Sequence, residues 1–320
     1  IGTHSLIQNP VNFNDLGLII IDEQHRFGVE HRKLLIEKGT SPQVLSMTAT
    51  PIPRTLSITI HGDMDISIID ELPKNRLPIK TSLIQPNEIE STYDFMKKEM
   101  EEGRQCFVVY PLIEESEKLD LEAAKSGFEK LKQIFKDFEV GYINGKMNKD
   151  EIDAQMLKMN KGEINCLVAT TVIEVGINIP NATVIMIENS ERFGMTQLHQ
   201  LRGRIGRGHK QSYCFFVQRK KTPNADKRLK IMTSTLDGFI ISDEDLKMRG
   251  PGDFFGTKQH GFIKSKVVDF SNDGPIIRRA RQQAFEMIIK DPKLSLNSNK
   301  KIKTVFKKKY NHMLEFVKIG

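Results

Sequence analysis

Short apolar runs that end in polar residues recur along this chain and alternate with stretches of helical spacing. Residues 16–21, Leu-Gly-Leu-Ile-Ile-Ile, form the first run and lead directly into Asp22. A second run over residues 44–47 leads into Thr48. Continuous apolar runs of this length are typical of strands buried on both faces of a parallel sheet. Because open sheets of this kind bind ligands beyond the carboxyl ends of their strands, we expect the polar residues there to be functional.

The alternation continues beyond a polar, proline-bearing boundary at residues 73–80. We predict strands at 106–112, 139–143, 165–169, 183–187 and 213–217. We predict helices at 89–100, 121–136 and 148–161, and further helices at 226–236 and 275–290. Strand–helix alternation at this spacing predicts an α/β fold, in which a parallel sheet carries helices on both faces.

The composition excludes several classes of protein. With 320 residues, 38% of them hydrophobic and 28% charged, the chain is unlike a disordered, collagen-like or membrane protein. No apolar run approaches the ~18 residues of a membrane span, and the first ten residues do not resemble a signal peptide. Because Cys106, Cys166 and Cys214 form no CxxC pair, we predict a reducing, cytoplasmic location.

The positive charge lies at one end of the chain. Residues 221–320 hold 21 basic and 11 acidic residues, a net charge of +10, whereas residues 1–220 carry −3. This asymmetry predicts a near-neutral body with a basic appendage that meets a polyanion. A solvated lysine-rich surface has the same composition, so charge alone leaves both interpretations open, as it does for the run Lys300–Lys309.

The string Asp22-Glu23-Gln24-His25 places two acids at the end of a predicted strand. Nucleotide hydrolysis on a phosphate-loop fold uses such a pair: the Asp holds Mg²⁺ on the phosphates, and the Glu polarises the attacking water. The alternative is a turn that starts a helix. The string by itself does not decide between these interpretations.

A second string, Gln200–Gly208, spaces several arginines with glycines. The glycines allow backbone and side chains to approach a ligand closely, and the guanidinium fork suits phosphate. As arginine fingers, Arg204 and Arg207 would stabilise charge on a transferring phosphoryl group. An ordinary exposed helix would avoid these glycines, so a phosphate-binding role is favoured.

Taken together, these strings resemble the motifs of superfamily-2 helicases and translocases. The strings that resemble helicase motifs II to VI are, in order, Asp22–His25, Thr48–Thr50, Cys106–Ser116, Ala169–Gly176 and Gln200–Gly208. The strings that more closely resemble the RecG family of bacterial branched-DNA helicases are Gly2–Gln8, Asp22–Gly28, Thr48–Thr55, Asp70–Pro73 and Gln197–Gly208. Residues 237–259 resemble that family's translocation motif, a helical hairpin and loop that couples ATP turnover to movement along duplex DNA.

The resemblance implies an architecture. Residues 1–75 would be the C-terminal part of a first RecA-like motor domain, and residues 76–220 a complete second one. Residues 221–320 would form the translocation hairpin and a basic C-terminal extension. The implied cofactors are ATP and Mg²⁺, with Asp22 as the metal ligand and Glu23, Arg204 and Arg207 as its catalytic companions.

The resemblance also assigns roles to polar positions of the motifs. The residues implied to contact or sense ATP are Gln24, His25, Glu174, Gly176, Asn178 and Gln200. The residues implied to contact DNA or couple it to the ATP site are Gly2, Thr3, His4, Thr48, Thr50, Thr170, Thr171, Arg228, Arg249 and Gln259. For each threonine the alternative is a local cap or turn hydrogen bond.

The chain departs from the family pattern in two places. Asn178 stands where the family carries Asp, which keeps a hydrogen-bonding oxygen but loses the charge. No Gly-x-x-x-x-Gly-Lys-Ser/Thr loop is present, since the nearest string, Gly141–Met147, is one residue too short. Because the family's phosphate loop and wedge domain lie upstream, and the chain begins at Ile1, we expect a C-terminal portion of a longer protein.

The function implied by the resemblance is ATP-dependent translocation on branched DNA. The implied partners are double-stranded and branched DNA, with single-strand binding protein as a further candidate; the resemblance implies no membrane, a monomer, and a cytoplasmic, nucleoid-associated location. One alternative is a transcription-repair coupling translocase, which shares the motor and a related hairpin. Another is that the isolated chain is a non-catalytic DNA-binding fragment, because it lacks the phosphate loop.

Overall fold

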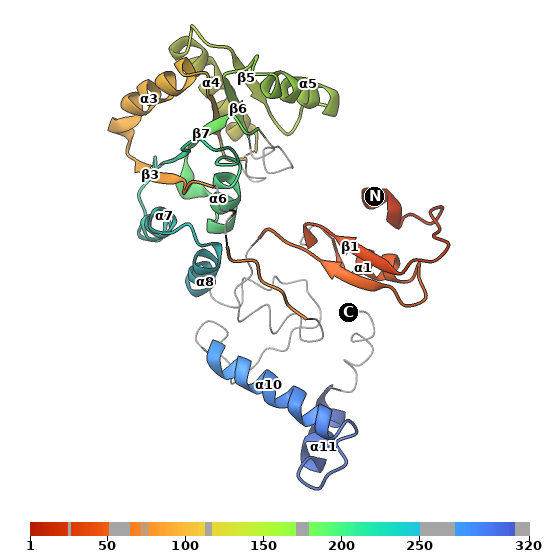
Figure 1. The fold of residues 1–320 in the computed structure, drawn as a ribbon. Coiled ribbons are helices and arrows are strands. Elements are labelled where there is room, and N and C mark those ends of the chain that lie inside the picture. Colours follow the sequence, from red (N-terminus) through yellow and green to blue (C-terminus); the bar gives the residue numbers. More distant parts are fainter. Residues whose placement is uncertain are drawn as a thin grey trace. The chain divides into compact units, whose positions relative to one another are not determined.

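The computed structural model describes residues 1–24, 27–50, 65–71, 73, 76–112, 117–170, 179–249 and 273–310. The chain separates into two compact units. One comprises Ile1–Ile68 and Leu246–Gly320, and the other comprises Ile69–Asp245. The fold of each unit is described separately below (Figure 1).

The second unit is built on a six-stranded sheet in which every strand pair is parallel. Its strands, in chain order, are β3 (Lys80–Ile84), β4 (Gln105–Val109), β5 (Val140–Ile143), β6 (Cys166–Ala169), β7 (Ala182–Ile187) and β8 (Tyr213–Val217). In space the order is β3-β8-β7-β4-β6-β5. The predicted parallel α/β sheet is confirmed, whereas β3 was missed because its alternating polar pattern followed the predicted boundary at 73–80.

Helices connect these strands. They are α3 (Ile89–Glu101), α4 (Glu117–Ile134), α5 (Lys149–Asn160) and α6 (Met195–Arg202), and α7 (Pro223–Ser234) and α8 (Gly238–Arg249) follow β8. The connections through α3 and α4 run across the sheet towards β5, whereas those through α5 and α6 run back towards β3. Because crossovers between parallel strands are right-handed, α3 and α4 cover one face of the sheet, and α5 and α6 cover the other. One core cluster accordingly joins α3 and α4 to alternate residues of the central strands, including Met96, Leu131, Val108 and Val168.

The central strands β4, β6 and β7 are buried along their whole length. Cys106 on β4 lies directly opposite Cys166 on β6, and Cys214 lies on β8. All three thiols are free and buried, and burial raises their pKa values, to about 12 for Cys166 and Cys214.

A buried ion pair anchors the amino end of the sheet. Glu99 at the end of α3 accepts two hydrogen bonds from Arg104 Nη1, at 2.7 and 2.6 Å, just before β4 begins. Thr183 on β7 donates a further hydrogen bond to the same carboxylate, at 3.2 Å. The Glu99 side chain is only 7% exposed, so the pair ties α3 to the start of the two central strands.

The amino-terminal part of the first unit holds a two-stranded parallel sheet, β1 (Leu18–Ile21) and β2 (Gln43–Ser46), with a short 3₁₀ helix η1 (His4–Ile7) and α1 (Val29–Ile36). Both predicted strands are confirmed. The expected burial on both faces is wrong within the described residues: Ile19 and Ile21 are buried, whereas Leu18 and Ile20 are more than half exposed. With two strands, one face is covered and the other is open.

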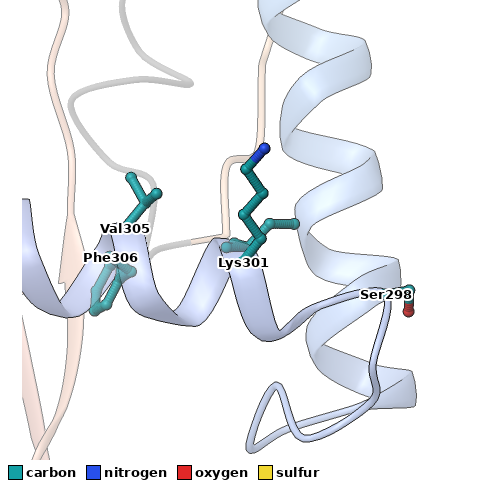
Figure 2. Close-up of a pocket in the computed structure, with 5 residues that line it drawn as sticks. Ser298, Lys301, Val305 and Phe306 are labelled. Carbon is teal, nitrogen blue, oxygen red and sulfur yellow. The ribbon is translucent and has the colours of Figure 1, made fainter.

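The carboxyl-terminal part holds α10 (Gly274–Lys290) and α11 (Lys300–Tyr310). The first confirms the predicted basic helix, and the second shows that the lysine-rich run is helical. Figure 2 shows a pocket beside α11, lined by Ser298, Lys301, Ile302, Val305 and Phe306. None of the predicted site residues lines this pocket. Among the described residues, no helix is long and apolar enough to cross a membrane.

Candidate functional site

The predicted acidic motif and the predicted coupling threonines lie at one edge of the amino-terminal sheet. Ile21 pairs in register with Ser46, so the residues after β1 and β2 leave the sheet side by side. The backbone N–H of Gln24 donates to the carbonyl of Met47 at 3.0 Å, which ties the two segments together beyond the strands. The fold thereby places Asp22, Glu23 and Gln24 beside Thr48 and Thr50, where parallel sheets bind ligands.

Glu23 has a strained backbone. Its φ is 51°, in the left-handed region, where a side chain other than that of glycine costs roughly 1–2 kcal/mol. Its N–H donates to Asp22 Oδ1 at 2.9 Å, which holds the turn. Strain of this kind persists where the surrounding structure enforces it, and it concentrates at functional sites. The sharp turn exposes Asp22 and leaves Glu23 half-buried beside it.

The donor set at this edge suits Mg²⁺ that is shared with phosphate. Mg²⁺ takes oxygen ligands and usually binds through one or two carboxylates, with phosphates and water completing the shell. The exposed carboxylate of Asp22 fits that requirement. No group of three or more His, Cys, Asp or Glu residues in the described ranges could hold a metal ion, so an ion at Asp22 would need phosphate and water as further ligands.

The other predicted residues of this unit make mostly local contacts. The hydroxyls of Thr48 and Thr50 bond to each other, and Thr50 N–H donates to Thr48 Oγ1 at 3.1 Å. Thr3 Oγ1 accepts a hydrogen bond from Ser5 N–H and caps η1, and a Cβ at Gly2 would lie 2.7 Å from Leu6 Cγ. These are the local cap and turn hydrogen bonds that were the alternative for the threonines. A DNA-contacting role for these residues remains a prediction.

His4 provides an unexpected link. Its ring stacks on Phe27 with centroids 4.3 Å apart and an interplanar angle of 10°. Phe27 follows the acidic motif, and its N–H donates to the carbonyl of Gln24 at 3.0 Å. The predicted DNA-contacting segment Gly2–His4 is therefore packed against the segment that leaves the predicted ATP site.

In the second unit, Gln200 lies in the last turn of α6, and the predicted arginine fingers follow the end of that helix. Gly206 between them has a φ of +72°, and a Cβ there would lie 2.9 Å from Ile79 Cγ1. Arg76 Nε donates to the carbonyl of Gly206 at 2.7 Å and so fixes this turn from outside. Partial burial and the nearby charge of Arg76 lower the pKa of Arg207.

Arg202, a residue of the string Gln200–Gly208 with no predicted role, is buried between α6 and α7. Arg202 is 2% exposed, and its Nη1 donates to the carbonyls of Met232 at 2.7 Å and Thr235 at 3.0 Å. Its Nη2 lies 3.2 Å from Nδ1 of His199, which must act as the acceptor because arginine only donates. Burial, and then the charge of Arg202, lower the pKa of His199 to about 4. Arg202 thus ties α6 to the end of α7.

Thr170 is buried and Arg228 is half-buried. Thr170 directly follows β6 and is fully buried, and its Oγ1 has no hydrogen-bond partner among the described residues. A direct contact with DNA would require this end of β6 to open. Arg228 donates to the carbonyls of Phe193 at 3.1 Å and Glu191 at 2.7 Å, so its guanidinium supports the segment that precedes α6.

Several predicted residues lie outside the described residues: His25, Thr171, Glu174, Gly176, Asn178 and Gln259. Arg249 ends α8, and the described atoms do not include its side chain. These assignments remain predictions. They include most of the string that resembles motif V and the loop of the translocation motif.

A charged network that sequence reasoning missed lies at the carboxyl end of β7 and β8. Arg219 makes a two-point ion pair with Glu188, at 3.0 and 2.9 Å. Glu191 accepts the backbone N–H groups of Arg219 and Lys220, each at 3.1 Å. The ion pair raises the pKa of Arg219. No motif signals these residues; their only sequence signal is position, since Glu188 directly follows an apolar run.

Comparison with known proteins shows which families the chain resembles. The model of the helicase conserved C-terminal domain matches residues 87–209, and that of ATP-dependent DNA helicase RecG, domain 3, C-terminal, matches residues 235–319. ATP-dependent DNA helicase RecG of Synechocystis sp. is 49% identical over 95% of this chain and 37% of its own length. That of Streptococcus pneumoniae is 52% identical over 89% of this chain and 42% of its own length.

The chain therefore spans less than half the length of these relatives. A solved structure of RecG bound to a three-way DNA junction is 44% identical, with a TM-score of 0.67. The likeness covers 87% of this chain and 35% of that one. The chain belongs to the RecG family of ATP-dependent DNA helicases, and it matches the part that holds the helicase C-terminal domain and the carboxyl end of domain 3.

Proposed function

We propose that the protein containing this chain is an ATP-dependent translocase that acts on branched DNA. The observation that carries the proposal is the likeness to RecG bound to a three-way DNA junction, which extends over 87% of the chain at 44% identity. The match of residues 235–319 to RecG domain 3 favours this function over a transcription-repair coupling translocase. The net charge of +10 over residues 221–320 suits a surface that tracks the DNA backbone.

The proposed mechanism assigns the chemistry to both units. Asp22 would hold the metal ion of Mg²⁺·ATP; bound Mg²⁺ neutralises charge on the phosphates. Glu23 would orient the attacking water and accept its proton. Arg204 and Arg207 would stabilise charge on the transferring phosphoryl group, which is worth ~10³–10⁵ in rate in known NTPases.

The remaining assignments belong to this proposal. Gln24, His25, Glu174, Gly176, Asn178 and Gln200 would line the nucleotide, and the threonines and the arginines of the hairpin would pass its state to DNA. We also propose the functional division into residues 1–75, 76–220 and 221–320, although the second compact unit extends to Asp245. Single-strand binding protein as a partner, a monomeric state and a cytoplasmic, nucleoid-associated location stay predictions.

The test is Glu23→Gln in the intact protein, which also supplies the phosphate loop. We expect ATP hydrolysis on a three-way junction to fall by at least ~100-fold, because the amide cannot take the proton. Junction binding should stay within about twofold of the wild type, since Glu23 neutralises no DNA phosphate. The isolated 320-residue chain should show no turnover.

The matched control is Glu30→Gln, which removes an exposed carboxylate from the first turn of α1. It should hydrolyse ATP at the wild-type rate. Normal turnover by Glu23→Gln would reject the proposed role of Glu23. Equal turnover on branched and linear duplex DNA would reject the branched substrate, while leaving the motor assignment intact.

A further inference from the structure

The segment between β7 and α6, residues 188–194, is held by polar contacts on several sides. Glu188 is paired with Arg219, and Glu191 accepts two backbone N–H groups at the end of β8. Ser190 Oγ donates to the carbonyl of Val217 at 3.0 Å. These contacts tie the segment to β8, the next strand in the sheet.

One contact ties the same segment to a distant part of the chain. Arg192 forms a two-point ion pair with Asp120 on α4, with 3.0 Å between Nη2 and Oδ2. The two residues are 72 positions apart. The Asp120 side chain is 4% exposed and the Arg192 side chain is 31% exposed. The carboxylate is therefore buried, whereas the arginine that contacts it is partly exposed to solvent. A charge-assisted, bidentate pair of this kind fixes orientation as well as distance.

The position of this segment matters because α6 begins immediately after it. The helix runs only from Met195 to Arg202, and Arg204 and Arg207 follow its end. Because α6 joins this segment directly to the arginine string, residues 188–194 help to set where Arg204 and Arg207 lie, together with the contacts of Arg202 and Arg76. Displacement of a catalytic group by about 1 Å can cost on the order of 100-fold in rate.

The same unit offers a contrast. Glu99 and Arg104 form another buried two-point pair, at the amino end of the sheet, where it bonds to Thr183 and not to the segment before α6. Both pairs bury a carboxylate against an arginine, and both are expected to stabilise the fold. Of these two pairs, Asp120–Arg192 is the one that holds the segment leading directly into α6 and the arginine string.

We propose that Asp120 is a positioning residue for phosphoryl transfer, which through Arg192 sets the location of α6 and hence of Arg204 and Arg207. This inference rests on the proposed function, because it assumes that the two arginines act on ATP. It assigns a task in catalysis to α4, a helix that contains none of the residues given a predicted role.

The experiment compares Asp120→Asn with Glu99→Gln in the intact protein, by ATP hydrolysis on a three-way junction and by thermal unfolding. For Asp120→Asn we expect kcat to fall by about tenfold or more, while KM for ATP stays within about twofold of the wild type. The reason is that arginine fingers stabilise mainly the transition state and not the bound substrate. For Glu99→Gln we expect a similar loss of thermal stability and a kcat within about twofold of the wild type. Asp120→Glu, which keeps the carboxylate, should recover at least about half of the lost kcat.

Two results would overturn the proposal: a wild-type kcat in Asp120→Asn, or equal losses of kcat in Asp120→Asn and Glu99→Gln. Should Asp120→Asn fail to fold, Arg192→Gln changes the more exposed partner and carries the same expectation. Arg204→Ala separates this inference from the function on which it rests. If Arg204→Ala hydrolyses ATP normally, the proposed function of the string fails; if it is inactive while Asp120→Asn is normal, only the positioning role fails.

Discussion

The two parallel sheets of this chain bury the same kind of sequence to different extents. Phe107 on β4 is 1% exposed, whereas Ile20 on β1 is 57% exposed, although both lie in short apolar runs. The difference comes from the surroundings: β4 lies between β7 and β6 in a six-stranded sheet, whereas β2 is the only described strand that pairs with β1. An apolar run thus predicts a strand, but the number of neighbouring strands and the covering helices decide how many faces are buried.

The two regions also differ in how they make a sharp turn beside a predicted ATP-binding residue. The second unit places Gly206 in the left-handed region, where glycine is free of strain. The amino-terminal sheet places Glu23 there, at some cost in stability. The carboxylate that we propose to act in ATP hydrolysis is therefore held in a conformation that favours glycine.

The largest expected effect sharpens the contrast in burial. Phe107→Ala should lower the free energy of unfolding of the six-stranded region by about 3–5 kcal/mol, because it leaves a cavity in a core that cannot fully collapse. Ile20→Ala should cost less than about 1 kcal/mol, because its side chain is already largely in water. Native-state hydrogen exchange of β4 and β1 amides measures each region separately.

A large loss of protection in β1 on Ile20→Ala would contradict this comparison. It would mean that the exposed face of β1 is covered in solution. A small effect of Phe107→Ala would mean that the core around β4 repacks.

A smaller effect on the free energy of unfolding is expected when the pH is lowered, because of His199 in the second unit. Its pKa in the folded chain is about 4, below the ordinary value of 6.5, so the unfolded chain binds a proton that the folded chain does not. The stability due to this difference is complete above pH 6.5 and is lost progressively as the pH falls from 6.5 to 4. The total is on the order of 3 kcal/mol.

His199→Gln should remove that pH dependence, because glutamine does not titrate. Urea unfolding of the six-stranded region at pH 7 and pH 4.5 provides the measurement. The wild type should lose more stability between the two pH values than the variant does. Parallel losses in the two proteins would show that other groups determine the acid sensitivity of this region.

Much of the fold could be predicted from sequence, because buried parallel strands are continuous apolar runs. The strands β5 to β8 lie within one residue of their predicted ranges, whereas β4 ends three residues before its predicted end. β3, an edge strand with alternating polar residues, gave no such signal. The short helices α1 and α6 were also missed, since eight residues with polar and apolar side chains mixed show little periodicity.

The site was predictable only where a motif names its residues. Asp22 and Thr48 were placed at strand ends, and the structure brings their segments to one edge. The interactions of the buried side chains of Arg202 and Asp120 could not be predicted, because each involves a partner 30 or more positions away in the sequence. Such pairings are set by tertiary packing, which a single sequence does not display.

The smallest expected effect tests the two sharp turns. Gly206→Ala should lower stability by about 1–2 kcal/mol, because its φ is +72° and the new Cβ would lie 2.9 Å from Ile79. Glu23→Gly should raise the stability of the β1–β2 region by up to about 1 kcal/mol, although it removes the carboxylate proposed to act in catalysis. Hydrogen exchange at amides beside each turn measures both. Opposite signs support the comparison, and a loss of stability in Glu23→Gly would contradict it.

The three buried cysteines have a practical consequence. Their thiols are buried in strands of the six-stranded sheet, and raised pKa values keep them protonated near neutral pH. Thiol reagents therefore meet little reactive thiolate while the sheet is intact. A cysteine introduced on an exposed helix, such as α10, would then be labelled selectively. Fluorescent dyes on such a cysteine would report movements of this chain without first removing its native thiols.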